Sequence, residues 1–544
     1  MTEWWRGGVI YQVYPRSFQD SNGDGIGDLP GIIDRLDHIA SLGVDCIWLS
    51  PFNRSPQADM GYDVSDYMAV DPLFGSLQDF DQLIEKAHAL GLKVIMDQVV
   101  SHTSDQHPWF GESAFSRDNA KADWYVWADA KPDGSPPNNW LSVFGGSAWE
   151  WHTGRKQYYL HNFLTSQPDL NFHNPAVQDA VLEVMRFWLD RGVDGFRLDT
   201  VNYYFHDAQL RSNPPLKSLK GEPATNPYDM QSHKFSKSQP ENIEWLKRVR
   251  ALLDQYPGTT SVGEVGDEER GVELMRAYTS GSSLLHMCYS FDFLGPKFTA
   301  RHFRSRAEAF FADGSTGWPC WSFSNHDVIR PMTRWAPFSV SPADLARQSA
   351  ALALTLKGSV GLYQGEELGL PEADILYEEL TDPRGIRFWP GDKGRDGCRT
   401  PLPWQHDLPY AGFSTARPWL PVKPAHVALS VDQQNADPNS TLNYYRTILA
   451  WRKTHPQLVT GDMTFFNTAE PVLAYRRSAG NKDLVCVFNL SPDPLTVKLS
   501  RVELALEPVS NNATLDGSNL TLGPNGFAIL PAPAGEGRVS YKAG

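Results

Sequence analysis

The stretch "PAVQDAVLEVMRFWLDRGVDGFRLDT", residues 175–200, decides the fold of this chain. Its first part carries apolar residues at three- and four-residue spacing, the period of an amphipathic helix. Residues 193–200 form a short, largely apolar run, typical of a strand that is covered on both faces. A helix that leads directly into such a strand predicts one unit of a parallel α/β sheet.

The same unit recurs along the chain. "SLQDFDQLIEKAHALG" precedes "LKVIMDQVV", and "PADLARQSAALALTLKG" precedes "SVGLYQGEE". Eight such units favour a closed (β/α)8 TIM barrel over an open sheet. The candidate strands are residues 9–15, 44–50, 93–100, 195–199, 260–265, 287–293, 318–325 and 358–364.

Other segments depart from this repeat. Residues 101–170 are rich in Trp, Gly, Pro and Asn and predict an inserted subdomain after the third strand, and a second polar insert follows at about 206–238. Short alternating runs after about residue 458 predict an antiparallel β-domain. We therefore expect barrel domain A at 1–100 and 171–458, inserted domain B at 101–170, and a C-terminal β-sandwich domain C at 459–544.

The net charge of the chain indicates which classes of partner it can bind. The chain of 544 residues has a net charge of −15. This charge speaks against nucleic acid and anionic lipid, which need a basic surface, and favours a neutral or small polar substrate. The N-terminus shows no signal peptide and no run is apolar over ~18 residues, so we expect no membrane span. Five scattered cysteines without a CxxC pair agree with a cytoplasmic protein.

Carboxylates stand at the predicted strand ends, where barrel enzymes hold their catalytic groups. The third strand reaches Asp97, the fourth Asp199, the fifth Glu264 and the seventh Asp327. Any one of them alone is as readily a cap or a structural ion pair. Several at the same end of one barrel make coincidence improbable.

Most glycoside hydrolases cleave the glycosidic bond with a pair of Asp or Glu carboxyl groups. Arg197 lies on the same strand face as Asp199 and would keep it charged, which suits a nucleophile. Glu264 follows an apolar run with no adjacent cation in sequence, so desolvation would raise its pKa, as a general acid requires. Asp327 would bind ring hydroxyls and favour the positively charged transition state.

The motifs around these residues resemble those of glycoside hydrolase family 13, the α-amylase superfamily. "DGFRLD" (194–199), "GEV" (263–265) and "NHD" (325–327) are similar to its fourth-, fifth- and seventh-strand motifs. "QPDLN" (167–171) resembles the motif that closes domain B, and "YQGEE" (363–367) the eighth-strand motif. "CRTPLPW" (398–404) is similar to a stretch of the α-glucosidase and oligo-1,6-glucosidase branch. The motifs occur in family order over nearly the whole chain.

The resemblance implies a retaining mechanism with Asp199 as nucleophile, Glu264 as acid/base and Asp327 as transition-state stabiliser, in a pocket for one non-reducing glucose. It implies further residues that hold the sugar: Tyr62 stacks on the ring, Asp59 with Arg399 closes the pocket end, His102, Arg197 and His326 hydrogen-bond the sugar or the carboxylates, and Phe144 and Phe163 form walls.

Two positions near the strand ends bear on specificity and on metal. In this branch the residue after the nucleophile, here Thr200, tends to be Val in enzymes favouring α-1,6 links and Thr or Ala in those favouring α-1,4; the alternative is an ordinary strand residue. Ser101 replaces the Asn that in amylases helps hold a calcium between domains A and B. That calcium is therefore not expected here.

A second loop predicts a different metal site. "DSNGDGIGD" (20–28) offers the side chains of Asp20, Asn22, Asp24 and Asp28 and the carbonyl of Ile26. The twelfth residue is Gly31, where an EF-hand needs a bidentate Glu. The family's glucosidases carry a similar loop, so we expect one structural divalent cation, Ca²⁺ or Mg²⁺, away from the pocket, and no organic cofactor. The alternative is a turn without an ion.

These features together predict an exo-acting α-glucosidase that cleaves short oligosaccharides or other small α-glucosides, with α-1,4 links preferred and transglucosylation open. One rival is a sucrose or maltose isomerase or transglucosylase on the same scaffold. Another is a catalytically dead barrel used as a binding subunit, but such chains lack the carboxylate trio and carry a membrane segment. The sequence does not indicate the oligomeric state.

Overall fold

The computed structural model describes residues 3–216 and 224–542. Eight parallel strands form one sheet in the order β11-β10-β9-β5-β2-β1-β13-β12. A parallel bridge between Cys288 of β11 and Pro319, next to β12, joins the two ends of this order. The predicted TIM barrel is therefore confirmed, and each strand lies within a predicted range: β1 Val9–Val13, β2 Cys46–Leu49, β5 Lys93–Gln98, β9 Gly195–Leu198, β10 Thr260–Val265, β11 Met287–Ser290, β12 Cys320–Ser322 and β13 Ser359–Tyr363.

The helix and strand at residues 175–200 show how the chain builds this barrel. α4 begins at Pro175, where Asn174 accepts a hydrogen bond from the Ala176 N–H and satisfies one free donor of the first turn. Its apolar stripe, which includes Val181 and Trp188, is buried. All four residues of β9 are buried, as a strand between two neighbours and under helices must be.

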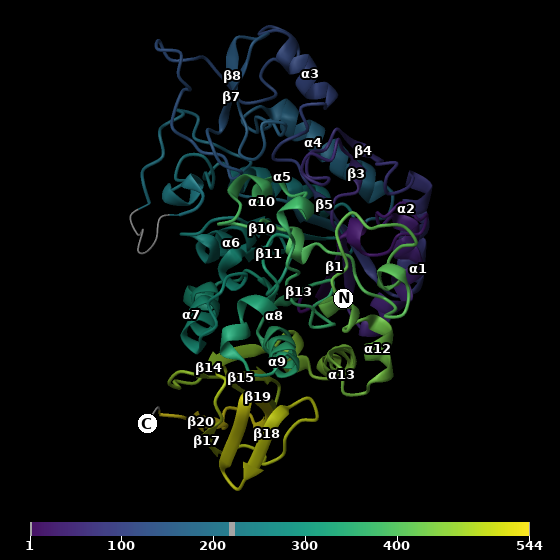
Figure 1. The fold of residues 1–544 in the computed structure, drawn as a ribbon. Helices are drawn as coiled ribbons and strands as arrows, with labels where there is room; N and C mark the ends of the chain where they lie inside the picture. Colours follow the sequence, from purple (N-terminus) through teal and green to yellow (C-terminus); the bar gives the residue numbers. More distant parts are fainter. Residues whose placement is uncertain (1–2, 217–223, 543–544) are drawn as a thin grey trace.

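Helices surround the strands in the ribbon view (Figure 1). Their bounds are α1 Leu29–Leu42, α2 Leu77–Ala89, α4 Pro175–Asp190, α5 Asn242–Leu253, α6 Gly271–Thr279, α7 Ala300–Phe311, α8 Pro331–Arg334, α9 Pro342–Thr355, α10 Pro383–Phe388, α11 Pro424–Val427, α12 Val431–Ala436, α13 Thr441–Lys453 and α14 Pro456–Val459.

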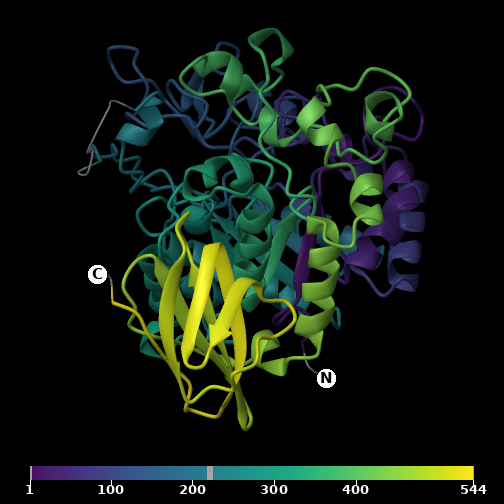
Figure 2. The ribbon, with the colours of Figure 1, turned by 60° about the horizontal axis from the view of Figure 1, so that its bottom comes forward.

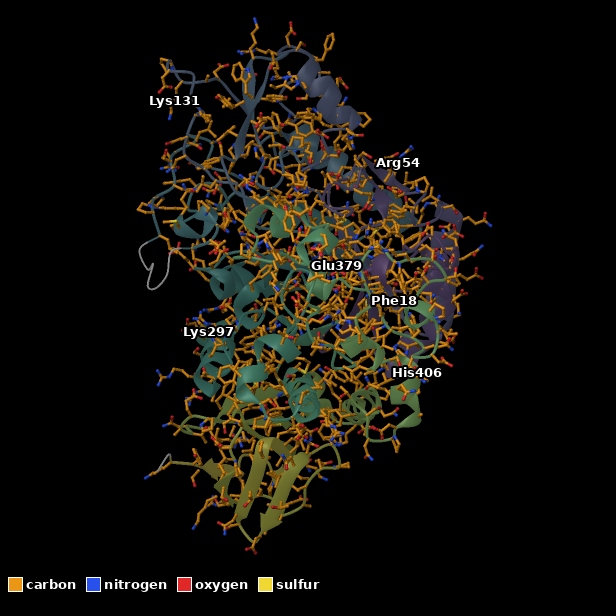
Figure 3. The ribbon with its side chains drawn as sticks, in the orientation of Figure 1. Phe18, Arg54, Lys131, Lys297, Glu379 and His406 are labelled. Carbon is orange, nitrogen blue, oxygen red and sulfur yellow. The ribbon has the colours of Figure 1, made fainter. Side chains whose placement is uncertain are left out.

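The chain between β5 and β9 holds structure of its own. It contains α3 (Pro108–Phe115) and a small antiparallel sheet of β6 (Trp127–Ala128), β8 (Gln157–Leu160) and β7 (Trp149–His152). These elements lie together beyond one end of the barrel, with exposed Lys131 at their outer edge (Figures 1 and 3). A further antiparallel pair, β3 (Asn53–Arg54) and β4 (Asp66–Val70), follows β2. In the expected insert at 206–238, residues 217–223 lie outside the described residues.

The C-terminal strands form an antiparallel sheet, as predicted, but hydrogen bonding joins them into one continuous sheet instead of the two of a sandwich. Residues 519–522 of β19 pair with β17 and β18, whereas residues 527–533 pair with β16. The sheet lies at the end of the molecule remote from α3 (Figures 1 and 2). Its strands are β14 Asp462–Phe465, β15 Val472–Ala479, β16 Lys482–Asn489, β17 Leu495–Ser500, β18 Asn511–Asp516, β19 Asn519–Pro533 and β20 Arg538–Ser540.

The proposed domain boundaries at residues 100, 170 and 458 stay predictions. Within residues 3–216 and 224–542, we find no helix with the length and apolar character needed to span a bilayer.

Candidate active site

A cavity of about 320 Å³ is built around the carboxyl ends of the barrel strands. The three predicted catalytic carboxyls all reach it: Asp199 follows β9, Glu264 belongs to β10 and Asp327 follows β12. Six predicted sugar-binding residues line it as well, namely Asp59, Tyr62, His102, Phe144, Phe163 and Thr200. The structure therefore brings together side chains that lie up to 268 residues apart in the sequence, from Asp59 to Asp327.

Arg197 is the buried centre of the carboxyl cluster. Its Nη1 lies 2.6 Å from Asp97 Oδ1 and 2.6 Å from Asp199 Oδ1. Its Nη2 lies 2.6 Å from Glu264 Oε1. Glu264 has no cation adjacent to it in the sequence, but it has one in the folded structure. The cation comes from the neighbouring strand, where Arg197 pairs with Val262 and so faces the same side as Glu264.

The carboxyl groups of this cluster have pKa values above those of ordinary Asp and Glu side chains. Burial raises the pKa of Asp199 to about 7 and the pKa of Glu264 to about 7, against the opposing charge of Arg197. Burial raises the pKa of Asp97 to about 6. Because one guanidinium serves both Asp199 and Glu264, Arg197 does not keep Asp199 charged in preference to Glu264. A raised pKa suits the acid role predicted for Glu264.

Asp327 has the opposite environment. Burial acts to raise its pKa, but His326, Arg395 and Arg399 outweigh burial and hold the pKa below its ordinary value. Asp327 Oδ1 lies 2.8 Å from Arg399 Nη2 and 3.3 Å from Arg395 Nη1. Asp327 is therefore a carboxylate at neutral pH, as a group that favours a positive transition state must be.

We expected Asp59 and Arg399 to close the pocket end together, but the cation that pairs with Asp59 is Arg395. Asp59 Oδ1 forms its ion pair with Arg395 Nη2 at 2.7 Å, and Asp59 Oδ2 accepts a hydrogen bond from Gln167 Nε2 at 3.1 Å. Arg399 is fully buried and binds Asp327 and the His326 carbonyl. Arg395 stands four residues before Arg399, lines the cavity and pairs with Asp59, whereas Arg399 is not among the lining residues.

Aromatic rings form a layered wall. Tyr62 stacks on His326 with ring centroids 5.1 Å apart, and its hydroxyl donates to Asp97 Oδ2 at 3.1 Å. His326 itself is fully buried, with Nε2 3.3 Å from Asp327 Oδ2. One face of Tyr62 is thus covered by His326. Phe144 and Phe163 meet edge to face, with centroids 6.2 Å apart.

Thr200 has an unusual backbone. Its φ is 39°, a left-handed value that is rare for a β-branched residue. In this conformation the Thr200 N–H donates to Glu264 Oε2 at 3.1 Å, and the Thr200 hydroxyl lies 3.3 Å from Asp199 Oδ2. Thr200 therefore touches both predicted catalytic carboxyls, which an ordinary strand residue would not do.

Several residues of the site were not assigned a role from the sequence. Asp97 and Tyr289 do not line the cavity but complete the carboxyl cluster behind it, since Asp97 pairs with Arg197 and the Tyr289 hydroxyl donates to Glu264 Oε1 at 2.8 Å. Others come from segments whose inward-facing positions no periodic pattern marks: Tyr203, Asn226, Tyr228, Asp229, Glu268, Phe291, Arg384 and Arg395. Asp97 had a visible signal, because it stands at a strand end as the other acids do.

The loop at residues 20–28 is tightly wound away from the cavity lining. Asp20 is buried, and its Oδ1 accepts from the Asn22 and Gly23 N–H groups while its Oδ2 accepts from Gly25 N–H. Asn22 and Asp24 each accept from the N–H two residues on, at Asp24 and Ile26.

Asp28 closes this loop by accepting the Gly31 N–H, which caps α1. The set of carboxylate, amide and carbonyl oxygens on Asp20, Asn22, Asp24, Ile26 and Asp28 fits Ca²⁺ or Mg²⁺. Metal binding by this loop stays a prediction.

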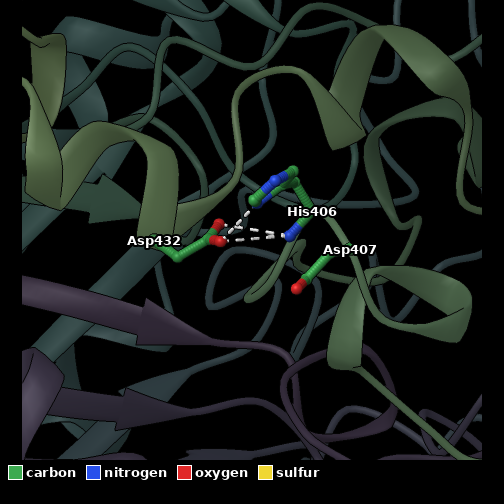
Figure 4. A group of neighbouring side chains, drawn as sticks. All are labelled: His406, Asp407 and Asp432. Carbon is green, nitrogen blue, oxygen red and sulfur yellow. Dashed lines mark hydrogen bonds and ion pairs between the residues drawn. The ribbon is translucent and has the colours of Figure 1, made fainter.

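A different cluster meets a simple distance criterion for metal ligands. Among residues 3–216 and 224–542, the group with ligand atoms within 4.8 Å of one another is His406, Asp407 and Asp432. His406 Nδ1 lies 2.6 Å from Asp432 Oδ2, whereas no hydrogen bond or ion pair joins Asp407 to either side chain (Figure 4). His406 and Asp407 are exposed, so an ordinary surface ion pair explains the group.

Comparison with known proteins agrees with this geometry. The family described as alpha amylase, catalytic domain, matches residues 12–461. A probable alpha-glucosidase of Rhizobium meliloti is 56% identical over 515 residues, which cover 94% of this chain and 93% of that protein. An oligo-1,6-glucosidase of Heyndrickxia coagulans is 37% identical over 534 residues, which cover 91% of this chain and 94% of that protein.

Two solved structures also superpose closely on this chain. An alpha-glucosyl transfer enzyme superposes with a TM-score of 0.94 at 54% identity and covers 98% of this chain and 100% of its own. The trehalulose synthase of Pseudomonas mesoacidophila superposes with a TM-score of 0.87 at 30% identity and covers 99% of this chain and 100% of its own.

Proposed function

The chain belongs to the alpha-amylase family of glycoside hydrolases, in its α-glucosidase and oligo-1,6-glucosidase group, and from that premise we propose that it is an exo-acting, retaining α-glucosidase. It removes a terminal non-reducing glucose from short oligosaccharides and other small α-glucosides. The observation that carries the proposal is the meeting of Asp199, Glu264 and Asp327 in one cavity that contains the buried Asp59–Arg395 pair.

The Asp59–Arg395 ion pair supports the exo-acting mode. Asp59 is 3% exposed, and its bond to Arg395 sets a charged, ordered wall in the cavity. A chain that continued past this wall would have to break a buried ion pair, which costs several kcal/mol, on the order of 3–5. The cavity therefore takes one sugar at its closed end and leaves the rest of the substrate toward the opening.

The retaining mechanism assigns one role to each carboxyl. Asp199 attacks the anomeric carbon, Glu264 gives its proton to the leaving oxygen and then activates water, and Asp327 stabilises the positive charge on the ring. Arg197 holds Asp199 and Glu264 on its two terminal nitrogens, so the two carboxyls keep a fixed separation. His102 and Tyr62 contact the sugar, and Phe144 and Phe163 form the walls.

A transglucosylase or sucrose isomerase is the second candidate. The alpha-glucosyl transfer enzyme at 54% identity favours it. Such an enzyme forms the same glucosyl-enzyme and differs in the acceptor, which is a sugar hydroxyl instead of water.

One experiment tests both candidates. Maltose, isomaltose, sucrose, trehalose and starch are each incubated with the enzyme, and products are followed by proton NMR from the first turnovers. We expect α-glucose as first product from the short substrates and slow attack on starch. Initial β-glucose contradicts the retaining mechanism, and isomerised disaccharide in place of glucose supports the second candidate.

The loop at residues 20–28 holds one structural Ca²⁺ or Mg²⁺ in this proposal, with Asp20, Asn22, Asp24, the Ile26 carbonyl and Asp28 as ligands. The oxygen-only donor set supports it. The ion would stabilise the loop before α1 and take no part in the chemistry.

We also propose a cytoplasmic location. All five cysteines, Cys46, Cys288, Cys320, Cys398 and Cys486, are free and buried. Reduced thiols are typical of cytoplasmic proteins. Cell fractionation followed by an activity assay tests this.

A further inference from the structure

Lys237 is a buried cation beside the wall of the catalytic cavity. Its side chain is 1% exposed, and its Nζ donates to the hydroxyl of Tyr203 at 3.1 Å and to that of Tyr228 at 3.0 Å. Its third contact, with Glu268 Oε2 at 3.3 Å, is weak because the Glu268 side chain is 66% exposed. Tyr203 and Tyr228 line the cavity, whereas Lys237 does not. The ammonium group therefore stands behind two tyrosines of the cavity wall.

The ammonium group is charged at neutral pH, and both hydroxyls keep their hydrogens. Burial acts to lower the pKa of Lys237, but Tyr203, Tyr228 and Glu268 outweigh burial and hold the pKa above its ordinary value. Burial raises the pKa of Tyr203 and of Tyr228. An ammonium group only donates, so its three hydrogens are matched by the two hydroxyl oxygens and the carboxylate.

The two tyrosine hydroxyls hold one hydrogen more than their mutual contact uses. Their oxygens lie 2.7 Å apart, so one hydroxyl donates to the other. The second hydroxyl cannot donate to Lys237, because an ammonium group accepts no hydrogen bond. Among residues 3–216 and 224–542, neither hydroxyl oxygen has a further hydrogen-bond partner. One hydroxyl hydrogen of the pair is therefore left for a ligand in the cavity.

The tyrosine pair lies on the side of the cavity that receives the leaving sugar. Glu264 is the proposed donor of a proton to the leaving oxygen, and Gly266 lines the cavity two residues after it. A Cβ atom at Gly266 would lie 3.4 Å from Tyr203 Cε2, so the Tyr203 ring packs beside this glycine. The exposed Glu268 that contacts Lys237 also lines the cavity and marks its opening. The pair therefore lies between the acid and the opening.

We propose that Tyr203 and Tyr228, held by Lys237, donate the remaining hydroxyl hydrogen to the sugar that leaves or accepts the glucosyl group. The proposal rests on the function inferred above, which places this second sugar toward the opening. Lys237 is a positioning residue, because it fixes the two hydroxyl oxygens and does not itself line the cavity. Its own backbone is held in place, since the Ser238 N–H donates to the Asn202 carbonyl at 2.6 Å.

The test compares a sugar leaving group with an aryl leaving group. Lys237→Met removes the ammonium group, and the triple variant Lys237→Met/Tyr203→Phe/Tyr228→Phe replaces the whole polar cluster with apolar side chains of similar volume. The kcat/KM values are measured on maltose and on p-nitrophenyl α-glucoside, whose aryl ring carries no hydroxyl. We expect the ratio of kcat/KM for maltose to that for the aryl glucoside to fall about 2- to 12-fold in both variants, which is the contribution of one hydrogen bond.

A second measurement isolates the accepting sugar. Each enzyme is given p-nitrophenyl α-glucoside with added glucose, so that nitrophenol release counts every glucosyl-enzyme formed. Proton NMR measures the disaccharide produced, and hydrolysis is the difference. The ratio of transfer to hydrolysis should fall by about the same factor in both variants. A general loss of structure would slow both outcomes and leave their ratio unchanged.

Lys86→Met is the matched control. Lys86 Nζ donates to the Ile33 carbonyl at 2.8 Å, between α2 and α1 and outside the cavity lining. The same chemical change at this position should leave both ratios at their wild-type values.

The outcomes distinguish this inference from the proposed function. A wild type that hydrolyses both substrates, and loses both activities in Asp199→Asn, supports the proposed function. Unchanged ratios in the triple variant then overturn the contact between the tyrosines and the second sugar. A fall in the triple variant with unchanged ratios in Lys237→Met overturns the positioning role of Lys237, and if Lys237→Met fails to fold, the triple variant decides. A wild type that cleaves neither substrate overturns the proposed function and this inference with it.

Discussion

Arg197 Nη2 lies 2.6 Å from Glu264 Oε1, and the Nη1 atom of the same guanidinium lies 2.6 Å from Asp199 Oδ1. Asp97 is the third acid on this one cation. Three buried acids around a single buried base cannot all be charged without a large electrostatic cost, so the cluster binds a proton in the pH range where an acid/base catalyst needs one.

Removal of Arg197 should therefore change both the pH dependence and the stability. In Arg197→Gln the pKa values of Asp199 and Glu264 lose the charge that opposes burial, so the acid limb of kcat/KM should move to higher pH. Unfolding free energy should fall by about 3–5 kcal/mol, the cost of breaking a buried ion pair. Denaturant titration and a pH series measure the two effects.

A matched control is Arg191→Gln. Arg191 pairs with Asp81 at 2.7 Å on the surface, and such a pair contributes about 0–1 kcal/mol. An unchanged acid limb in Arg197→Gln would show that Arg197 does not set the protonation of the cluster.

Asp199→Asn should lose nearly all turnover yet resist heat better than the wild type at alkaline pH. Burial raises the pKa of Asp199 to about 7 in the folded state, against about 3.9 in an unfolded chain. The folded state therefore binds more protons than the unfolded state between these values, and this group's contribution to stability falls as pH rises from about 4 to about 7.

The amide of Asn does not titrate, so Asp199→Asn removes this loss of stability at high pH. The gain in Tm from Asp199→Asn should thus be larger at pH 8 than at pH 4, as calorimetry at the two pH values would show. A lower Tm than wild type at pH 8, or near wild-type turnover, would contradict the placement of Asp199 as a buried nucleophile.

Glu264→Gln should distinguish substrates by their leaving groups. Natural disaccharides need a proton on the leaving oxygen, so their kcat/KM should fall severely. A p-nitrophenyl α-glucoside has a leaving group that needs little protonation and should lose much less. Glu268→Gln is the control, because Glu268 lines the same cavity and should affect both substrates alike. Equal losses for both substrates in Glu264→Gln would remove Glu264 from the acid role.

The barrel and its carboxyls could be predicted because each depends on a local pattern. A buried strand reads as an apolar run, and its last residue is where a barrel enzyme presents polar groups. The contact of Arg197 with Glu264 depends on how two strands align, which no local pattern in the sequence specifies. It needs the register between β9 and β10, in which Arg197 stands opposite Val262, and that register is set by packing of the whole barrel.

The partner of Asp59 lay beyond sequence reasoning for a similar reason. Arg395 and Arg399 stand in one short stretch, and both are cations that could reach the cavity. Which of them meets Asp59 depends on how the loop between β13 and α11 folds over the barrel, where no periodic pattern exists. The three-dimensional structure places Arg395 there at 2.7 Å.

Metal removal should affect stability more than chemistry. If the loop at residues 20–28 holds a divalent cation, chelation lowers Tm by linkage and leaves activity in the cold nearly intact. Asp24→Ala should reproduce the effect and abolish the response of Tm to added Ca²⁺ or Mg²⁺. Asp133→Ala is the control, because Asp133 also accepts an N–H two residues on, from Ser135, in an exposed turn. If chelation stopped turnover while the fold stayed intact, the structural role of the ion would be wrong.

The last prediction concerns linkage preference and Thr200. Thr200 lines the cavity, and its hydroxyl lies 3.3 Å from Asp199 Oδ2. Val and Thr are both β-branched, so Thr200→Val keeps the shape and the strained φ of 39° and changes chiefly the hydroxyl. We expect the wild type to cleave maltose better than isomaltose and Thr200→Val to shift the ratio of kcat/KM toward isomaltose.

The size of this shift should be modest. A single hydrogen bond contributes about 0.5–1.5 kcal/mol, which is up to roughly tenfold in preference. Thr103→Val makes the same chemical change at a buried hydroxyl that binds Tyr125 outside the cavity lining, and it should leave the ratio unchanged. A wild type that prefers isomaltose, or a Thr200→Val enzyme slowed equally on both sugars, would mean that the hydroxyl beside the nucleophile does not select the linkage.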